Sequence, residues 1–283
     1  MSQVDVRPRG AVVELALASH PGPTVAVTVF AGAMALGAGA TARTAVLVTL
    51  AVLAGQLSIG WSNDWVDAAR DAAVGRTHKP VGAGRLSVGT VRAAAWTAAV
   101  ACVVVSATLG WRAGLVNVAT VASAWSYNVR LKNSPWSWAP FAFSFGLLPL
   151  VIALALPGAP VAAWWAVAGG ALLGVGAHLA NVLPDLEDDV GTGVRGAGHR
   201  LGRTTTSALA AGTLLAATVL VVVAPPGRPS GAALVALAGA VVLAATGTVV
   251  ALRASRSRWP FTAAILVAAL DVVLLVGSDW VVR

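Results

Sequence analysis

Acidic side chains are rare in this apolar chain, and most of them gather at two places. Seven of the eleven Asp and Glu residues lie in two short stretches, Asp64, Asp67 and Asp71 and then Asp185, Glu187, Asp188 and Asp189. In the first stretch, "NDWVDAARD" at residues 63–71, the aspartates stand at i, i+3 and i+7, so three carboxylates share one face of a helix. In the second, Asn181, Asp185 and Asp189 are spaced at i, i+4 and i+8. The similar helical spacing in the two stretches predicts two carboxylate faces that act together.

Like charges at these spacings repel each other, so a cation must offset them. Mg²⁺ prefers oxygen ligands and is usually held by one or two carboxylates together with substrate phosphates. Two carboxylate faces that meet across a bundle would therefore hold a pair of Mg²⁺ ions over a diphosphate. Basic residues that suit a phosphate lie nearby in the sequence: Arg70, Arg76, Lys79, Arg130, Lys132 and Arg203. The alternative is that the acids are solvated loop charges paired with arginines, which two matched clusters disfavour.

The elements that must position these groups are membrane spans. The 283 residues are 58% hydrophobic and only 11% charged, whereas a soluble domain carries about 25% charged residues. Windows of about 20 apolar residues predict nine spans, at roughly 24–42, 44–62, 90–110, 113–129, 138–157, 161–183, 205–224, 231–252 and 260–280. No stretch alternates as a strand would. We expect an all-α polytopic membrane protein, with about nine transmembrane helices in one domain over residues 1–283 and an N-terminal tail over 1–22.

Basic residues predict the orientation of these spans. If the N-terminus is cytoplasmic, only Arg43, Arg112, Arg228 and Arg283 fall on the opposite face, which leaves fifteen of the nineteen Lys and Arg residues in cytoplasmic segments. This is the bias of the positive-inside rule. Both acidic clusters then lie at cytoplasmic ends of spans, in a multi-pass protein of a bacterial cell membrane. The placement accounts for the net charge of +8 without a nucleic-acid partner.

The paired motifs resemble those of the UbiA superfamily of intramembrane prenyltransferases. "NDWVDAARD" is similar to its NDxxDxxxD motif, and "DLEDD" at 185–189 is similar to its DxxxD motif. Three further stretches resemble the segments around these motifs, "GRTHKPVGAGRLS" at 75–87, "YNVRLK" at 127–132 and "DDVGTGVRGAGHRLG" at 188–202. The resemblance spans nearly the whole chain and implies the nine-helix prenyltransferase fold.

The resemblance implies a Mg²⁺-dependent transfer of an isoprenyl group from an allylic diphosphate to an aromatic or other lipid-precursor acceptor, with release of pyrophosphate. The metal ligands that it implies are Asn63, Asp67, Asp71, Asp185 and Asp189. The substrate-binding residues that we expect are Asn63, Arg76, Lys79, Arg130, Lys132 and Asn181. Asp64 belongs to the same catalytic motif, and Tyr127 would lie near the reacting carbon. The family often has an Arg-Pro pair before the first span, where this chain has His20.

Two other functions remain open. An intramembrane terpene cyclase would use the same diphosphate site, but its allylic cation would be quenched within the prenyl chain. A cation or metabolite transporter would use the acids as a binding site, although coupling sites in transporters lie near the bilayer midplane. Asp271, in the last predicted span, matches no motif, and it could contact substrate or form a hydrogen bond between helices. Acceptor choice depends on the shape of a cavity, which the linear sequence does not show.

Overall fold

The structure is a computed structural model of the chain, and it describes residues 10–73, 75–76, 79–184, 186, 193–253 and 257–282. Its described part is almost entirely helical, as the sequence predicts. Nine long helices coincide with the nine predicted spans: α2 (Pro21–Gly37), α3 (Ala42–Ala73), α4 (Val88–Ala107), α5 (Trp111–Val129), α6 (Ala139–Ala155), α7 (Trp164–Val182), α9 (Ala197–Val223), α10 (Gly231–Arg253) and α11 (Trp259–Val276). A short helix α1 (Ala11–Ala18) precedes them, and the 3₁₀ turn η1 (Leu131–Asn133) follows α5.

Six of these helices are long enough and apolar enough to cross a membrane, namely α3, α4, α7, α9, α10 and α11. The apolar helices α2 and α6 are shorter, with 17 residues each. Helix α5 has 19 residues but carries Arg112, Asn117 and Asn128, which lower its hydropathy. Large apolar side chains such as Trp111, Val235 and Val273 are exposed on the outside of the bundle. An apolar outer surface suits a protein surrounded by lipid.

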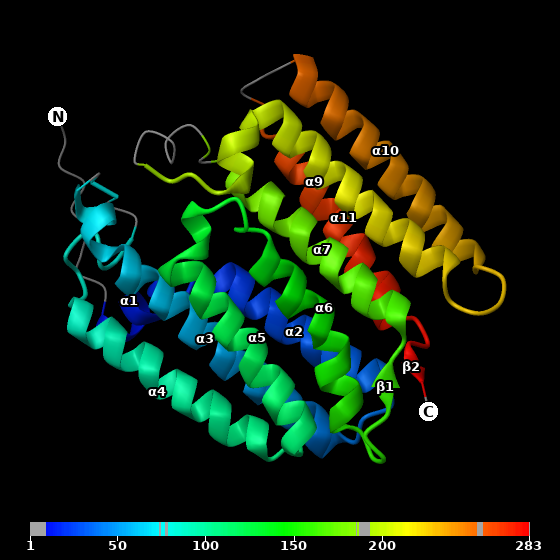
Figure 1. Cartoon of the computed structure of the whole chain (residues 1–283), viewed down its shortest axis with the longest axis horizontal. Coiled ribbons are helices and arrows are strands. Elements are labelled where there is room, and N and C mark those ends of the chain that lie inside the picture. The colour runs from blue at the N-terminus through cyan, green and yellow to red at the C-terminus, as the bar shows by residue number, and fades with distance from the viewer. Residues whose placement is uncertain are drawn as a thin grey trace.

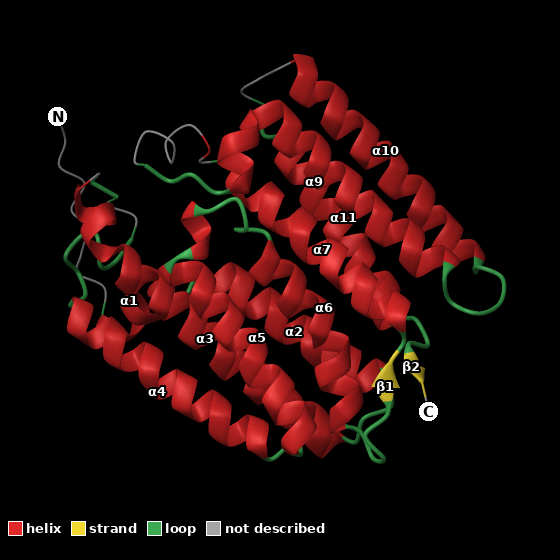
Figure 2. Ribbon diagram, viewed as in Figure 1, coloured by secondary structure: helices red, strands yellow, loops and turns green. Residues whose placement is uncertain are grey.

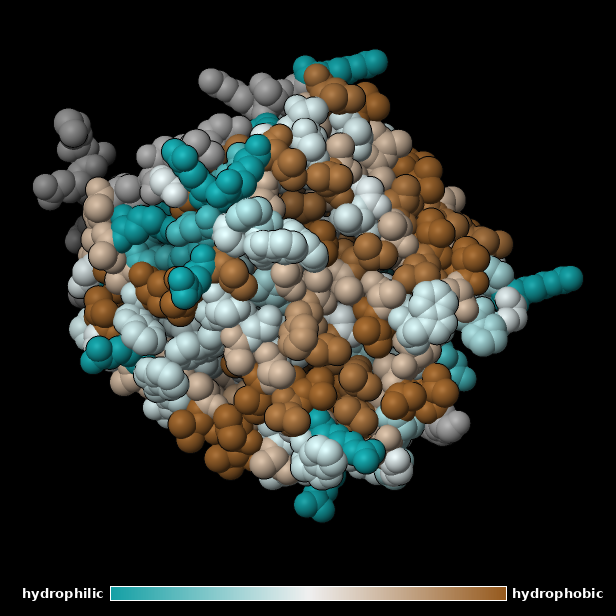
Figure 3. All heavy atoms as spheres, in the orientation of Figure 1, coloured by the Kyte–Doolittle hydropathy of each residue, from teal (hydrophilic) through white to brown (hydrophobic). Residues whose placement is uncertain are grey.

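Successive helices run in alternating directions and pack against each other, with α4 and α10 at opposite edges of the bundle (Figure 1). Helix α3 ends, and α4 begins, at one end of the bundle, which also holds α1 and η1. Hydrophilic side chains gather over this end in the space-filling view, while apolar atoms cover much of α9 and α10 (Figure 3). We call it the motif end, because the stretch 63–71 lies there.

Two glycines allow close backbone approaches that set the positions of α2 and α7. A Cβ atom at Gly60 of α3 would overlap the backbone carbonyl of Ser19, which lies just before α2. A Cβ atom at Gly170 of α7 would lie 2.5 Å from the carbonyl oxygen of Phe145 on α6. Small residues let membrane helices approach closely in this way. The turn before α2 is thereby held against the polar part of α3, and α7 against α6.

Two strands of two residues each were not predicted. β1 (Val161–Ala162) pairs antiparallel with β2 (Val281–Val282), at the end of the bundle opposite the motif end (Figure 2). The pair joins the connection between α6 and α7 to the C-terminal segment. A two-residue strand is too short to show the alternation by which strands are recognised in a sequence.

Candidate active site

The first acidic motif lies on α3, which continues to Ala73, well beyond the predicted end of its span at residue 62. The side chains of Asp64, Asp67 and Asp71 are 2%, 5% and 1% exposed, so all three carboxylates are buried. Spacings of three and four residues return to the same side of a helix, which turns them inward together. Buried carboxylates require compensating charges or hydrogen bonds, and the structure supplies both.

Lys79, in the loop after α3, provides the first compensating charge. Its Nζ atom lies 3.0 Å from Asp64 Oδ1, 3.0 Å from Asp71 Oδ2 and 3.5 Å from Asn63 Oδ1. Burial alone would lower the pKa of Lys79, but the attraction of Asp64 and Asp71 outweighs it and raises the pKa above its ordinary value. The ammonium therefore remains charged between the two carboxylates.

Lys132, in η1, and two arginines compensate the remaining carboxylate charge. Lys132 Nζ forms a buried ion pair with Asp67, whose other oxygen accepts a hydrogen bond from Arg70 at 2.8 Å. Arg76 Nη1 lies 3.4 Å from Asp71 Oδ1. Burial lowers the pKa of Lys132 below its ordinary value, although Asp67 opposes the shift. Each of the three aspartates therefore has at least one cationic partner in this state.

His20 is a site neighbour that the sequence did not place. It lies between α1 and α2 in the left-handed backbone region, at φ 55°. Its Nε2 atom is 3.1 Å from Asp64 Oδ1. The position at which the family often has an Arg-Pro pair thus contacts the first acidic motif through an imidazole. The only signal in the sequence was that departure from the family pattern.

Asn128 is a second such neighbour. Asn63 Nδ2 donates a hydrogen bond to Asn128 Oδ1 at 3.2 Å, and Asn128 Nδ2 donates to Ser62 Oγ at 2.8 Å and to the carbonyl oxygen of Ile59 at 3.0 Å. This network fixes the end of α5 against α3. It also orients the Asn63 amide so that its oxygen faces Lys79.

Tyr127 precedes Asn128 and lies in an aromatic group at the same end of the bundle. Its ring contacts Phe141 and His178 edge to face, at centroid distances of 5.1 and 5.7 Å. His178 is buried on α7, and its Nε2 atom lies 3.0 Å from Ser137 Oγ. Ser137 Oγ also accepts a hydrogen bond from the backbone N–H of Ala197, which ties α7 to the start of α9.

Not every expected site residue lies among the three aspartates of α3 and their basic partners. Arg130 and Asn181 are exposed, and no contact among the described residues links either of them to the three aspartates. Asp185 and Asp189 lie outside the described residues. The structure thus gives the environment of the first motif, while the expected meeting of the two motifs is not part of what it describes.

The donor atoms of the first motif suit a hard divalent cation. Carboxylate and amide oxygens are the ligands that Mg²⁺ prefers, and one or two carboxylates suffice when phosphates and waters complete the shell. Within the described part of the chain, no group of three or more His, Cys, Asp or Glu side chains converges on one point. The lysine ammonium groups of Lys79 and Lys132 instead lie against the carboxylates, and they would have to share these oxygens with a metal ion.

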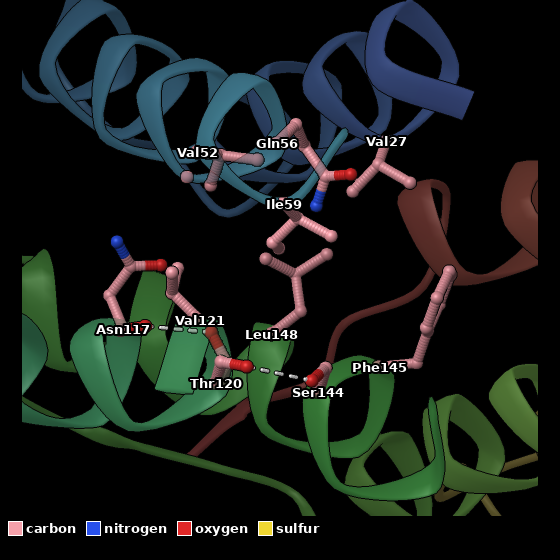
Figure 4. A pocket seen from close by; sticks show the side chains of 11 residues that line it. Val27, Val52, Gln56, Ile59, Asn117, Thr120, Val121, Ser144, Phe145 and Leu148 are labelled. Carbon is pink, nitrogen blue, oxygen red and sulfur yellow. Dashed lines mark hydrogen bonds between the residues drawn. The ribbon is translucent and has the colours of Figure 1, made fainter. Parts of the chain in front are cut away.

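A small cavity of about 40 Å³ lies among α2, α3, α5 and α6 (Figure 4). Its lining includes Ile59, whose carbonyl oxygen accepts a hydrogen bond from Asn128, so the cavity adjoins the network beneath the aspartates. Most of the lining is apolar, and its few polar side chains include Gln56 of α3 and Ser144 of α6. This volume lies well below the range of small-molecule sites, about 300–1,000 Å³.

Asp271 lies elsewhere. It is fully buried on α11, and its Oδ1 atom accepts a hydrogen bond from Thr218 Oγ1 of α9 at 2.5 Å. Asp271 does not line the cavity beneath the aspartates. Of the two roles open to it from the sequence, the contacts correspond to the hydrogen bond between helices.

The sequence model of the UbiA prenyltransferase family matches residues 25–272. No curated protein matches the sequence. The fold is similar to that of a UbiA homologue from Aeropyrum pernix K1 in its apo form, with 20% identity, a TM-score of 0.68 and coverage of 87% of this chain and 97% of that one. It is also similar to a UbiA homologue from Archaeoglobus fulgidus bound to GPP and Mg²⁺, with 15% identity, a TM-score of 0.70 and coverage of 93% and 98%.

A third similar structure is that of a digeranylgeranylglyceryl phosphate synthase, with 12% identity, a TM-score of 0.64 and coverage of 94% of this chain and 97% of that one. At these identities the structural matches establish the fold.

Proposed function

The chain belongs to the UbiA prenyltransferase family and is a multi-pass membrane enzyme, and from that premise we propose that it transfers an isoprenyl group from an allylic prenyl diphosphate to a hydrophobic or aromatic acceptor. The observation that carries the proposal is the placement of the three buried aspartates of α3 beside Lys79 and Lys132, at one end of an otherwise mostly apolar bundle. A charged head group and an isoprenoid substrate require such a pair of environments side by side.

The metal proposed for this site is Mg²⁺. A similar structure from Archaeoglobus fulgidus is bound to GPP and Mg²⁺, and another to DMAPP and Mg²⁺. Here Asn63, Asp67 and Asp71 would hold the metal, with Asp185 and Asp189 from the second motif. When bound, Mg²⁺ would neutralise charge on the diphosphate and make pyrophosphate a better leaving group.

The remaining side chains of the site would bind and orient the donor. Lys79, Lys132 and Arg76 already lie within ion-pair distance of the carboxylates, and they would bind diphosphate oxygens. Arg130 and Asn181, which lie apart from the cluster, would contribute at its edge. The face of the Tyr127 ring would stabilise positive charge at the allylic carbon through a cation–π interaction.

In the proposed reaction the bond between the allylic carbon and the diphosphate oxygen breaks, and its electron pair leaves with pyrophosphate. A new bond then forms between that carbon and the acceptor, which loses a proton. The terpene-cyclase alternative shares the first step and differs in the second. We further propose that the motif end faces the cytoplasm, which is the side that the arginine and lysine distribution favours, in a cell membrane of a bacterium.

The test is an incubation of the purified full chain with geranyl diphosphate and Mg²⁺, with and without a lipid extract as the source of acceptor, followed by mass spectrometry. The proposal expects pyrophosphate release and a geranylated product that requires the extract. A cyclic hydrocarbon or alcohol formed without the extract would instead support the cyclase. No release of pyrophosphate under either condition would contradict both.

A further inference from the structure

Glu14, on the short helix α1, is a buried acid that belongs to neither acidic motif. Its side chain is 3% exposed, and its Oε2 atom lies 3.0 Å from Arg85 Nε. Arg85 is 32% exposed and lies in the segment between α3 and α4. A buried carboxylate requires a compensating charge, which the guanidinium provides. The ion pair therefore connects α1 to the segment that also carries Lys79.

Arg85 and Lys79 belong to one compact turn, residues 79–86. The backbone carbonyl of Lys79 accepts a hydrogen bond from the N–H of Ala83 at 2.9 Å. The carbonyl of Pro80 accepts hydrogen bonds from the N–H groups of Arg85, at 2.9 Å, and of Leu86, at 3.3 Å. Because these bonds join its beginning to its end, the turn moves as a unit, and a displacement of Arg85 also displaces Lys79.

The turn lies directly against the first acidic motif. A Cβ atom at Gly82 would be 3.1 Å from Asp71 Cβ, so a glycine is needed for this close approach. Val81 and Leu86 are buried, and they belong to a small apolar cluster that also contains Ala18 of α1, Ala68 of α3 and Val91 of α4. The position of the turn therefore depends on α1 as well as on α3.

Helix α1 has its own attachment to α3, beside which it lies at the motif end (Figure 1). Trp61 Nε1 of α3 donates a hydrogen bond to the backbone carbonyl of Leu15 at 2.8 Å. Leu15 follows Glu14 directly, so this bond fixes the backbone from which the carboxylate extends. Glu14 is thus a fixed point, and Arg85 is the charged contact through which it acts on the turn.

We infer that Glu14 is a positioning residue for the diphosphate donor, which acts through Arg85 on the turn that carries Lys79. Lysine is a compact charge on a flexible four-carbon chain, so the position of its backbone decides where the charge can lie. With the turn in place, Lys79 Nζ lies 3.0 Å from both Asp64 and Asp71. The inference rests on the proposed function and deepens it, since Lys79 is proposed there to bind diphosphate oxygens.

The test is titration calorimetry of the purified full chain with geranyl diphosphate in saturating Mg²⁺. Glu14→Gln keeps the shape of the side chain and removes its charge, and the partly exposed Arg85 is left in contact with solvent, so the variant should fold. We expect its Kd for the donor to rise about fivefold, within the range of couplings inside one ion-pair network. Arg85→Lys keeps a cation that reaches Glu14, and its Kd should stay within about twofold of the wild type.

The matched control is Asp279→Asn, which removes the same charge from an exposed position just before β2, at the opposite end of the bundle. Its Kd should equal that of the wild type. The decisive comparison uses Lys79→Gln, whose neutral amide still donates to a carboxylate. Because Glu14 acts through Lys79, the addition of Glu14→Gln to this variant should change Kd by less than about twofold.

Three results would overturn the role of Glu14: wild-type donor binding by Glu14→Gln, a loss in Arg85→Lys as large as in Glu14→Gln, or a full fivefold loss when Glu14→Gln is added to Lys79→Gln. The last result would show that Glu14 supports the fold without acting on Lys79. In each case the wild type still binds the donor, so the proposed function stands. A wild-type protein that does not bind geranyl diphosphate in Mg²⁺ contradicts the prenyltransferase proposal and this inference with it.

Discussion

The imidazole of His20 contacts the carboxylate of Asp64, at 3.1 Å between Nε2 and Oδ1, although 44 residues separate them in the chain. The contact depends on Gly60, which allows the carbonyl of Ser19 to lie against α3. Asp64 therefore has two partners, His20 from the turn before α2 and Lys79 from the loop after α3. The acidic motif is therefore held in place by one residue that precedes it in the chain and one that follows it.

We expect His20→Phe to raise the KM for geranyl diphosphate about fivefold, because Asp64 loses a hydrogen bond that fixes its orientation, worth about 1 kcal/mol. His20→Arg should keep KM within about twofold of the wild type, since a guanidinium can also bind the carboxylate. Steady-state kinetics with both variants check this. Unchanged KM and kcat in His20→Phe would show that the contact has no role in donor binding.

Removal of the metal should abolish turnover without unfolding the protein. Lys79, Lys132, Arg70 and Arg76 already compensate the aspartates, so the fold does not need a divalent ion. In EDTA we expect loss of pyrophosphate release and a melting temperature within about 2 °C of the untreated protein. Mg²⁺ together with geranyl diphosphate should then raise the melting temperature, since a ligand at 100 times its Kd stabilises by about 2.7 kcal/mol. A large loss of stability in EDTA alone would contradict this reading of the lysines.

The close approach of α6 and α7 can be tested with one pair of glycine variants. Gly170→Ala places a methyl group 2.5 Å from the carbonyl oxygen of Phe145 and should destabilise the protein by about 1–3 kcal/mol. Gly212→Ala, on α9, meets no atom within 4 Å and should be neutral or stabilising by up to about 1 kcal/mol. Denaturant titrations in mixed micelles measure both. Equal effects of the two substitutions would be inconsistent with the packing described for α7.

Asp271 is expected to stabilise the contact between α9 and α11 and to have no part in turnover. Thr218→Val removes the hydroxyl that donates to Asp271 and should cost about 0.6–1.7 kcal/mol, the range of hydrogen bonds between membrane helices. Asp271→Asn retains an acceptor oxygen, so its kcat should stay within about twofold of the wild type. A variant Asp271→Asn that is as stable as the wild type but inactive would instead place this residue in the reaction.

The fold was largely predictable because a bilayer imposes long apolar helices, and these are visible in the sequence. Helix α3 extends past the predicted span at 44–62, in agreement with the helical spacing of its three aspartates. A hydropathy window ends where charges begin, but α3 continues to Ala73 since Lys79 and Lys132 compensate its aspartates. The short helix α1 and the two-residue strands carry too little periodicity to be predicted.

The site was predictable to the extent that its chemistry lies in one helix. Three carboxylates at helical spacing indicated an acidic face of one helix, which α3 has; the structure adds that this face is buried. Other features depend on how helices that are distant in sequence pack against each other, and residue spacing carries no information about this packing. They are the contact of His20 with Asp64, the contact of Asn128 with Asn63 and the position of Gln56 in a cavity. The meeting of the two acidic motifs remains a prediction, because Asp185 and Asp189 lie outside the described residues.

The most direct test of the account is the release of pyrophosphate from geranyl diphosphate by Asp67→Asn, compared with Asp279→Asn, which changes an exposed aspartate remote from the site. The account predicts that Asp67→Asn inserts and folds but loses at least about 100-fold in rate, since a metal contributes several kcal/mol of charge stabilisation. Asp279→Asn should retain the wild-type rate. A folded Asp67→Asn protein that releases pyrophosphate at more than about a tenth of the wild-type rate in saturating Mg²⁺ would contradict the proposed metal site.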